Sequence, residues 1–454
     1  MFSGIASRWL ATLTTILTGY VLMPFLVGHL GQEGYGIWSL IAGITNAIGL
    51  LLLGAPLASL RYLCVAVANN DEDDANRILG SSFGLYLILA ALGLVAGVLL
   101  YRFFGRYPIP AESQASARQA YAVGVFACAL GFLSRLPMAI FSAHGDFAVQ
   151  SRITIAADVI RVACTMLFVL HGDPLVGVAL GQLAGVVSEL ALFALVTGRR
   201  YPAITVSLRF FRAAVVRKML YFSLPVILVG VGGYLSFQTD PLVIGVVLPV
   251  SDIPHYLVGS RLIAMLLGFA QAMAAVVTPT AAKLHARAET VELTALLLRW
   301  GTYASWLSVA ALGALAVAGP SLVSWWIGPE FKASSVIVLD ILAMGYLICM
   351  PAQCVAYPIL VATGRVGAAG AAFVAAGIVN IILSLVLGHR LGLAGVALGT
   401  AIPMTAYGIF LQSLACRQVG VSLPRYFMHT LLWPFFGLVP AVRVIWKRSL
   451  RIAQ

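Results

Sequence analysis

Long apolar runs dominate this chain and limit what it can fold into. Twelve segments are long enough to cross about 30 Å of hydrocarbon as helices. Of the 454 residues, 61% are hydrophobic and only 10% are charged, whereas a soluble domain carries about 25% charged residues. The length of the runs also excludes a transmembrane β-barrel, whose strands alternate apolar and polar residues. The sequence therefore predicts an all-α polytopic membrane protein.

The twelve expected spans form two groups of six. The first group covers approximately residues 10–30, 36–60, 79–101, 119–141, 149–171 and 174–198. The second covers approximately residues 219–247, 254–282, 294–318, 335–361, 367–388 and 393–416. Because six crossings return the chain to its starting side, each group is expected to form one six-helix lobe. The lobes, residues 1–198 and 219–416, are expected to be parallel repeats, as in many transporters.

Two stretches lie outside the expected lobes. Residues 199–218 are expected to link the lobes on the cytoplasmic side through a basic amphipathic helix. Residues 417–454 form a tail whose apolar part, residues 425–446, is long enough to be an extra span. A crossing would carry the basic end of the chain to the outer side, so an interfacial or re-entrant helix is favoured.

The basic residues predict the orientation. With a cytoplasmic N-terminus, the inner ends and loops hold sixteen Lys and Arg residues, and the outer loops hold five. The most basic stretch, residues 197–225, contributes six of the sixteen and has no acidic residue. Cytoplasmic loops of membrane proteins carry such an excess. The protein is therefore expected in the plasma (inner) membrane, with its N-terminus in the cytoplasm and its first apolar segment kept as a span.

The sequence lacks the common catalytic and nucleotide-binding motifs. It has no HExxH, P-loop or nucleophile-elbow pattern, and its six cysteines stand singly without metal-ligand spacing. No loop is long enough to fold as a domain, so any chemistry belongs to the membrane region. We expect no enzyme activity, no cofactor and no metal site. The net charge of +12 is expected to reflect cytoplasmic loops and an anion cavity instead of nucleic-acid binding.

Ionisable residues inside the spans are the candidate functional residues, because charge at membrane depth is costly. Asp158 and Arg161 lie three residues apart on one helix face, and Glu189 of the next span lies at a similar depth. These three are expected to form one polar cluster. Asp240 and Arg261 each lie about seven residues from the outer ends of neighbouring spans and are expected to pair. For both groups the alternative is that the charges only neutralise one another and hold the helices together.

Two further arginines add positive charge without an expected partner. Arg135 lies within the fourth span, and Arg61 lies at the inner end of the second, where it can also extend to the headgroups. A guanidinium group suits the recognition of phosphate. The sequence thus predicts substrate binding by Arg61, Arg135 and Arg161, and coupling or gating by Asp158, Glu189, Asp240 and Arg261.

Glycines recur every four residues in two spans. Gly177, Gly181 and Gly185 follow this spacing in the sixth span, and Gly395 and Gly399 follow it in the twelfth. Small residues at this spacing let two membrane helices approach closely. We expect close helix packing there and no functional site.

Several motifs resemble those of polysaccharide exporters of the O-antigen flippase type, within the multidrug/oligosaccharidyl-lipid/polysaccharide superfamily. They occur in the expected order over nearly the whole chain. The quoted motifs are PFLVGHLGQEGYGIWSLI (residues 24–41), LLLLGAPLASLRYL (50–63), FQTDPLVIGVVLP (237–249), HYLVGSRL (255–262), WWIGPEF (325–331), ILVATGR (359–365) and LGLAGVALGTAI (391–402).

The resemblance implies two six-helix lobes around a central cavity and a flippase function. Such proteins move a polyprenyl-diphosphate-linked oligosaccharide from the cytoplasmic to the outer leaflet, and many use an H⁺ or Na⁺ gradient. Arg61 matches the family's arginine at the end of span two, and Asp240 matches its acidic residue in span seven. The usual acid before the span-two glycine is replaced here by Leu53. Besides the glycan substrate and the bilayer, polymerase and other glycan-assembly proteins are the partners that the resemblance implies.

Two other functions remain open at this stage. A cation-coupled multidrug antiporter of the same superfamily would favour an acidic cavity, whereas Arg61, Arg135 and Arg161 are basic. A membrane glycan polymerase or ligase would need a large outer loop for its catalytic residues, and this chain has none.

Overall fold

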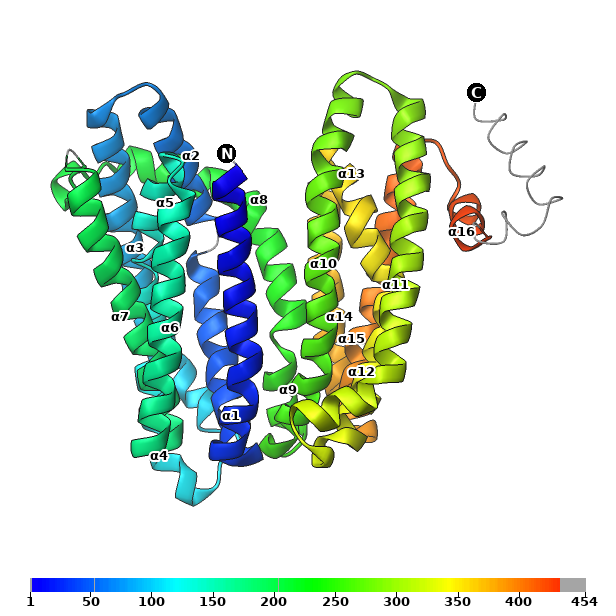
Figure 1. Ribbon diagram of the computed structural model, residues 1–454, viewed down its shortest axis with the longest axis horizontal. Helices are drawn as coiled ribbons and strands as arrows, with labels where there is room; N and C mark the ends of the chain where they lie inside the picture. Colours follow the sequence, from blue (N-terminus) through cyan, green and yellow to red (C-terminus); the bar gives the residue numbers. More distant parts are fainter. Residues whose placement is uncertain (1, 53, 203, 433–454) are drawn as a thin grey trace. The chain divides into compact units, whose positions relative to one another are not determined.

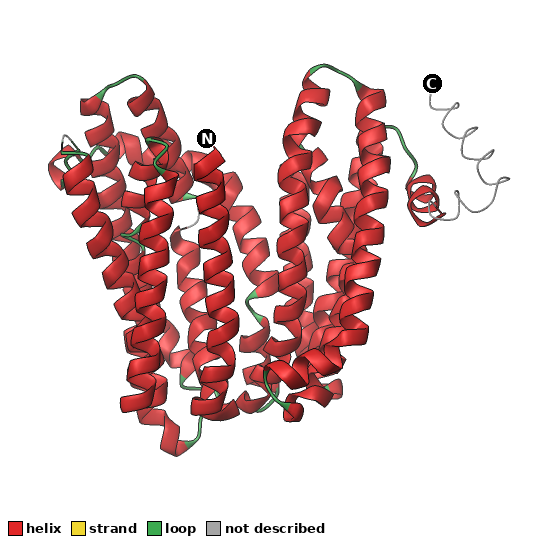
Figure 2. Cartoon of the chain, in the orientation of Figure 1, coloured by secondary structure: helices red, strands yellow, loops and turns green. Residues whose placement is uncertain are grey.

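The described part of the chain folds into helices, as the apolar runs predict (Figures 1 and 2). The computed structural model describes residues 2–52, 54–202 and 204–432. Within them, ten helical segments are long and apolar enough to span a membrane, and one bent pair makes an eleventh. One of the ten, Leu17–Ala68, is 52 residues long and contains the first two expected spans. The predicted fold class is confirmed, because only helices satisfy their own backbone hydrogen bonds in hydrocarbon.

The helices of the first half follow the order expected from the apolar runs. They are α1 (Phe2–Gly49), α2 (Ala55–Ala68), α3 (Glu72–Phe104), α4 (Gln114–Gly131), α5 (Arg135–Ala143), α6 (Phe147–His171) and α7 (Pro174–Arg200), with short 3-10 turns at Leu50–Leu52 and Ala111–Ser113. Within α1 the helix is interrupted at Gly31, whose φ of 69° lies in the left-handed region. The interruption separates the first two expected spans.

The second half continues from α8. Its helices are α8 (Ala213–Phe237), α9 (Asp240–Val247), α10 (Ile253–Ala286), α11 (Thr290–Trp326), α12 (Lys332–Pro351), α13 (Tyr357–Ala362), α14 (Val366–Leu391), α15 (Leu393–Gln418) and α16 (Leu423–Leu432). A π-helical turn, Ala352–Ala356, joins α12 to α13. Short 3-10 turns lie at Leu208–Phe210, Val250–Asp252 and Pro329–Phe331.

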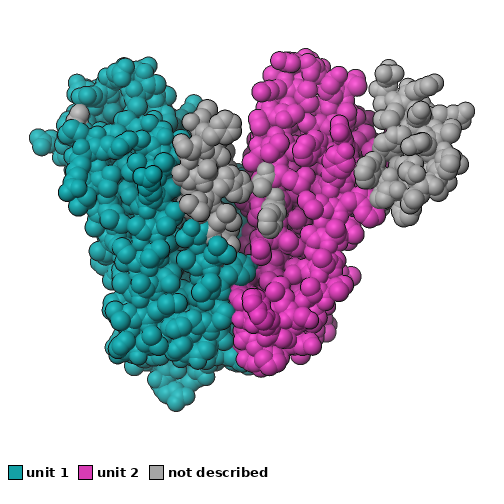
Figure 3. Space-filling model, viewed as in Figure 1, with its two compact units in different colours: residues 1–234, 244–254 teal, residues 235–243, 255–454 magenta. Residues whose placement is uncertain are grey.

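Packing divides the chain into two compact units (Figure 3). Unit 1 comprises residues 1–234 and 244–254, and unit 2 comprises residues 235–243 and 255–454. The chain therefore passes from one unit to the other near the end of α8, further along than the linker expected at residues 199–218. The assignment of six spans to each membrane lobe stays a prediction.

Residues 199–218 do not form the expected surface helix. Helix α7 continues to Arg200, α8 begins at Ala213, and between them the only helical element among the described residues is the turn Leu208–Phe210. This stretch instead lies against α3 as an irregular strap, residues 201–202 and 204–212. Side chains of α3 accept hydrogen bonds from two of its backbone N–H groups.

Two side chains and two glycines of α3 hold the strap. Asn76 Oδ1 accepts a hydrogen bond from the Thr205 backbone N–H at 2.8 Å, and Ser81 Oγ accepts one from the Arg212 N–H at 3.0 Å. A Cβ atom on Gly80 would lie 2.6 Å from the Ser207 carbonyl oxygen, and one on Gly84 would lie 2.5 Å from the Phe211 ring, so only glycine lets the strap approach this closely. These contacts hold the strap to unit 1.

Two spans of unit 1 are broken near their middles. In the second span, the helix stops before Gly54, whose φ is 80°, and resumes as α2. In the fourth, residues 132–134 separate α4 from α5. Both α2 and α5 begin with a proline in the first turn, Pro56 and Pro137, a position where its missing N–H costs little. Broken helices at membrane depth leave free helix ends, which transporters use to bind polar groups.

Helix α16 occupies the first part of the expected tail helix. It packs against α11, where Trp306 Nε1 donates to the Thr430 carbonyl oxygen at 2.9 Å. Residues 433–446 of the expected interfacial or re-entrant helix lie outside the described residues.

The glycine spacing in α7 produces the close contact with α6 that the sequence predicts. A Cβ atom on Gly177 would lie 2.8 Å from backbone atoms of Phe168 and Val169, and one on Gly181 would lie 2.0 Å from Thr165 Oγ1. In unit 2, a Cβ on Gly395 would lie 2.0 Å from the Leu387 carbonyl oxygen. The glycines therefore act through packing.

We predict that Gly177→Ala destabilises the protein whereas Gly198→Ala on the same helix does not. The new methyl of Gly177→Ala meets backbone, which cannot rotate away, and overpacking of this kind costs about 1–3 kcal/mol. Gly198 has nothing within 4 Å of its Cβ position, so alanine there is neutral or stabilising by up to about 1 kcal/mol. Thermal unfolding of the purified protein in detergent measures both variants. Equal melting temperatures would contradict the packing assignment.

Candidate functional site

A half-buried ion pair lies within one turn of α6 in unit 1. Arg161 Nη2 and Nε each lie 3.2 Å from Asp158 Oδ1, and the two side chains are 21% and 16% exposed. The stem of Arg161 packs on Gly185 of α7, where a Cβ atom would lie 2.7 Å from the Arg161 Cβ. Arg161 is thus held both by packing and by a carboxylate of its own helix.

Glu189 joins this pair from α7, which agrees with the predicted polar cluster. Its carboxylate lies within hydrogen-bonding reach of Ser134 and interacts electrostatically with Arg135 and Asp158. Arg135 is therefore a fourth member, which the sequence did not assign to the cluster. Two carboxylates and two guanidinium groups, those of Arg135 and Arg161, give the group no net charge.

Arg135 occupies an unusual place, the first residue of α5 at the break in the fourth span. Its side chain is exposed, and Nη1 lies 3.7 Å from Met138 Sδ. Helix α5 packs against α2, the other helix that begins inside a broken span. The N–H groups of Arg135 and Leu136 bond to carbonyl oxygens three residues back, so α5 continues from α4 through a tight turn. An exposed guanidinium group suits an anionic partner.

Arg61 lies in a third environment, on α2. Its guanidinium carbon lies 4.4 Å from the centre of the Phe222 ring of α8, and its side chain is exposed. A cation–π contact at an exposed site contributes about 0.5–1 kcal/mol, less than an opposing carboxylate in a dry site. The structure therefore separates Arg61 from the cluster that holds Arg135 and Arg161, and Arg61 has no acidic partner among the described ion pairs.

A second polar cluster is buried in unit 2 around Asp240, the first residue of α9. Tyr256 of α10 donates its hydroxyl proton to Asp240 Oδ2 at 2.6 Å, and Thr400 Oγ1 of α15 lies 3.3 Å from Oδ1. Asn380 of α14 also bonds to the carboxylate. Asp240 is 5% exposed, and its three partners are 3% exposed or less. Four helices thus meet at one buried carboxylate.

Several acceptor oxygens of this cluster share the same hydroxyl protons. The single Thr400 hydroxyl proton lies within reach of Asp240 Oδ1, of Asn380 Oδ1 at 3.2 Å and of the Val396 carbonyl oxygen at 3.4 Å. Ser384 adds one proton, which it donates to Asn380 Oδ1 at 2.8 Å. Buried acceptors without donors are costly. Oxygens gathered in this way can bind a further proton or a monovalent cation.

The pairing of Asp240 with Arg261 stays a prediction. The described partners of the carboxylate are neutral hydroxyl and amide groups. Successive residues of a helix turn by about 100°. Arg261 follows Tyr256 by five residues on α10 and therefore faces about 140° away from the side that meets Asp240.

The sequence missed several members of these clusters. Tyr256, Asn380 and Thr400 are neutral, so a search for charge at membrane depth does not find them. Asp340 of α12 is charged and lies within a span, and the same search should have included it. Its Oδ1 atom is buried without a hydrogen-bond partner among the described residues.

No resident metal site accompanies these clusters in the part of the chain that the structure describes. No group of three or more His, Cys, Asp or Glu side chains there could hold a metal ion. Asp240 contributes one negative charge and is otherwise surrounded by neutral oxygens. One charge suits a proton or a monovalent ion better than a divalent metal.

Known proteins match this chain in sequence and in fold. The family model described as polysaccharide biosynthesis protein matches residues 2–285. The uncharacterized membrane protein EpsK of Bacillus subtilis (strain 168) is 23% identical over 447 residues, which cover 94% of this chain and 85% of EpsK. The family match confirms the resemblance that the sequence motifs indicate.

Solved structures of two transporter types share the fold. An inward-facing multidrug resistance MATE family transporter of the MOP superfamily superimposes with a TM-score of 0.77 at 16% identity, over 90% of this chain and 94% of the other. The lipid II flippase MurJ in an inward closed conformation superimposes with a TM-score of 0.72 at 13% identity, over 97% and 92%. The superfamily fold predicted from the sequence is therefore confirmed.

We predict that Tyr256→Phe destabilises the protein and that Tyr346→Phe, at an equally buried tyrosine of α12, does not. Loss of the Tyr256 hydroxyl leaves the buried Asp240 carboxylate with one donor fewer. Hydrogen bonds inside membrane proteins contribute about 0.6–2 kcal/mol. The Tyr346 hydroxyl makes no hydrogen bond to the described residues, so its removal is close to neutral. Thermal unfolding in detergent compares the variants, and an equal loss in both would contradict the assigned role of Tyr256.

Proposed function

We propose, since the chain belongs to the polysaccharide biosynthesis protein family, that it translocates a polyprenyl-diphosphate-linked oligosaccharide across the membrane. The movement runs from the cytoplasmic to the outer leaflet by alternating access. The observation that carries the proposal is the exposed pair of cations in unit 1, Arg61 and Arg135, at broken spans of a multi-pass membrane protein.

The physical task is to move a diphosphate through hydrocarbon. An ion moved from water to an apolar medium costs tens of kcal/mol without compensation, so the lipid cannot flip unaided at a useful rate. A protein lowers this cost when it replaces the hydration of the diphosphate with fixed donors and positive charge. The lipid tail needs no such help, because it stays in hydrocarbon.

Arg135 and the adjoining end of α2 supply such an environment. Arg135 is the first residue of α5, whose first N–H groups are already bonded to the preceding turn, and α5 packs against α2, which begins at Ala55 without a side-chain cap. Free N–H groups at a helix N-terminus bind anions, and the helix dipole adds to their effect. The diphosphate is proposed to bind here, and Glu189 compensates Arg135 when no substrate is bound.

Arg61 lies further along α2 and provides a second cation. Its contact with Phe222 holds the guanidinium group in place without neutralising it. Arg161 differs, because Asp158 already compensates its charge. Substrate binding by Arg161 stays a prediction, with the ion pair as its alternative role.

Asp240 is proposed to couple transport to an H⁺ or Na⁺ gradient. Its carboxylate is a negative charge buried among neutral oxygens, and four helices of unit 2 meet there. Binding or release of one charge changes the cost of keeping these helices together. Asp158 and Glu189 are proposed to gate transport for the same reason. The position of Arg261 gives no comparable support for a coupling or gating role.

The cellular setting follows from the orientation. The excess of basic residues at one side supports a cytoplasmic N-terminus in the plasma (inner) membrane. The protein then receives its substrate where sugars are assembled on the lipid and delivers it to polymerase or other glycan-assembly proteins. A cation-coupled multidrug antiporter is the second candidate, and the MATE-like fold favours it.

Export should depend on Arg135. We expect Arg135→Ala to lower it about ten- to a hundredfold, since hydrogen bonds to charged groups contribute about 1.5–3 kcal/mol. Arg135→Lys should recover part of the export, because lysine keeps the charge but lacks the planar guanidinium group that bonds to phosphate through two N–H groups. The assay measures lipid-linked glycan at the outer leaflet in cells that depend on this protein, with protein amount checked by immunoblot.

Arg102→Ala, at an exposed arginine near the end of α3, is the matched control and should export normally. Normal export by Arg135→Ala would contradict the diphosphate site. If deletion of the protein leaves glycan export unchanged and raises drug sensitivity, the antiporter is the correct function.

Coupling should depend on Asp240. We expect Asp240→Asn, purified and reconstituted in vesicles, to lose the stimulation of transport by an imposed H⁺ or Na⁺ gradient. Asparagine keeps the size of the side chain and removes the charge, although it replaces one acceptor oxygen with an N–H donor. Glu292→Gln, at an exposed acid of α11, is the control and should keep the stimulation. Full gradient dependence in Asp240→Asn would assign coupling to another residue.

A further inference from the structure

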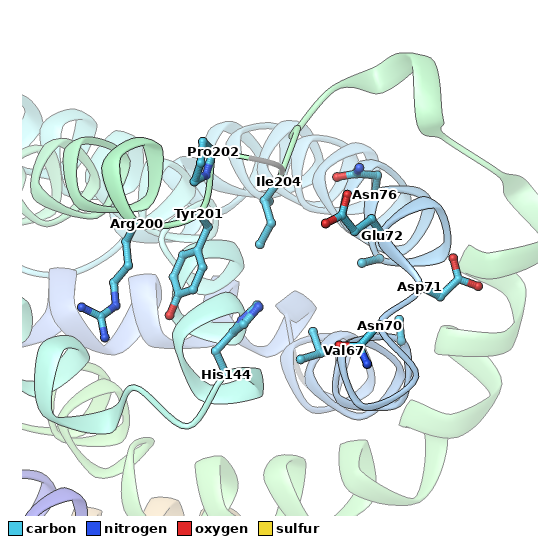
Figure 4. Close-up of a pocket in the computed structure, with 12 residues that line it drawn as sticks. Val67, Asn70, Asp71, Glu72, Asn76, His144, Arg200, Tyr201, Pro202 and Ile204 are labelled. Carbon is cyan, nitrogen blue, oxygen red and sulfur yellow. The ribbon is translucent and has the colours of Figure 1, made fainter.

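A pocket of about 320 Å³ lies at one end of unit 1, apart from the candidate arginines (Figure 4). Its walls come from the turn between α2 and α3, the end of α5 and the residues that follow α7. This end carries the basic stretch and is therefore the one expected in the cytoplasm. Small-molecule sites span about 300–1,000 Å³, so the pocket suits a small ligand.

One wall of the pocket is fixed by the Asp146 carboxylate. Arg200 donates to it from Nε at 2.7 Å and from Nη2 at 2.8 Å, and the Tyr201 hydroxyl donates to it as well. The hydrogen bonds from Arg200 lower the pKa of Asp146, so the carboxylate is charged at neutral pH. Burial raises the pKa of Tyr201 to about 12, so its hydroxyl keeps the proton that it donates. The Tyr201 ring is thereby held in one orientation.

His144 completes this wall. Its ring centre lies 4.4 Å from that of Tyr201, and its Nδ1 lies 2.8 Å from the Ile140 carbonyl oxygen. A carbonyl only accepts, so Nδ1 carries the proton and Nε2 of the neutral ring is an acceptor. The wall thus offers an aromatic face and a hydrogen-bond acceptor.

The opposite wall offers both kinds of hydrogen-bonding group. Glu72, in the first turn of α3, has an exposed carboxylate. Asn76 uses its Oδ1 to bind the strap at Thr205, which leaves its two amide N–H donors for a ligand. Figure 4 shows Glu72 and Asn76 across the pocket from His144 and Tyr201. The apolar side chains Val67 and Ile204 lie between the two walls.

The charges around the pocket exclude some ligand classes. Asp71, Glu72 and Asp146 oppose the single guanidinium of Arg200, so a phosphate or a carboxylate would be repelled. Among the described residues, no group of three acidic, His or Cys side chains is arranged for a metal. What remains is a neutral or cationic ligand with an apolar face and polar edges.

We propose that this pocket is a saccharide-binding subsite for an uncharged or amino sugar of the lipid-linked glycan. The C–H face of the sugar packs on Tyr201 and the apolar side chains. Its hydroxyls donate to Glu72 and His144 and accept from Asn76. Acidic sugars are rejected by the surplus of carboxylates. The source of the sugar rests on the proposed function, whereas binding of a free sugar does not depend on it.

The test uses the purified full-length protein in nanodiscs and saturation-transfer NMR. The probes are N-acetylglucosamine, glucosamine and glucuronic acid. We expect the first two sugars to bind. Glucuronic acid should bind at least about tenfold more weakly, which corresponds to a difference of about 1.4 kcal/mol in binding free energy. Ile204→Trp, which fills the pocket, should abolish binding. Glu72→Gln should weaken glucosamine more than N-acetylglucosamine, because it removes only the charge.

Glu112→Gln is the matched control, since Glu112 is an exposed acid at another turn of unit 1, between α3 and α4. It should leave binding of all three sugars unchanged. The proposal is overturned if neither N-acetylglucosamine nor glucosamine binds, if glucuronic acid or inorganic phosphate binds best, or if Ile204→Trp binds normally. If the protein exports glycan but binds no free sugar, the subsite is ruled out and the proposed function stands. If it binds sugar but exports no glycan, the proposed function is ruled out and the subsite stands.

Discussion

The cost of an unpaired polar group in hydrocarbon governs this structure. Backbone N–H and C=O groups cannot bond to water there, so each apolar run forms a helix that satisfies them internally. The same cost applies to side chains, and it explains why the few charges at membrane depth occur in groups. Asp158 pairs with Arg161 within one turn of α6, and Asp240 gathers hydroxyl and amide donors from three other helices.

Departures from regular helices mark the places where function is expected. In unit 1 the helix breaks before α2, which begins without a side-chain cap, and a tight turn between α4 and α5 carries Arg135 at its end. The remaining helix surfaces pack closely, because glycines such as Gly177 let α7 approach the backbone of α6. Rigid packing around a broken span keeps the free helix ends in a defined position.

The charges differ mainly in whether they are compensated. Arg161 is balanced by its own helix, and its stem is enclosed by Gly185. Arg61 and Arg135 are exposed: Arg61 contacts Phe222 without a carboxylate partner, whereas Arg135 interacts electrostatically with Glu189. The pocket beside α7 has the opposite character, since carboxylates outnumber its one guanidinium group. The unit therefore offers separate surroundings for an anionic group and for an uncharged ring.

The sequence by itself determined the fold class, the order of the spans and the family, because apolar length and local motifs are properties of neighbouring residues. It also indicated the cluster of Asp158, Arg161 and Glu189, which follows from helical spacing and depth. Only the tertiary structure decided the partners of Asp240. Tyr256 and Thr400 are separated by 144 residues and carry no charge, so no local pattern connects them. The path of residues 201–202 and 204–212 was decided in the same way, since the glycines of α3 that receive this strap are distant in sequence.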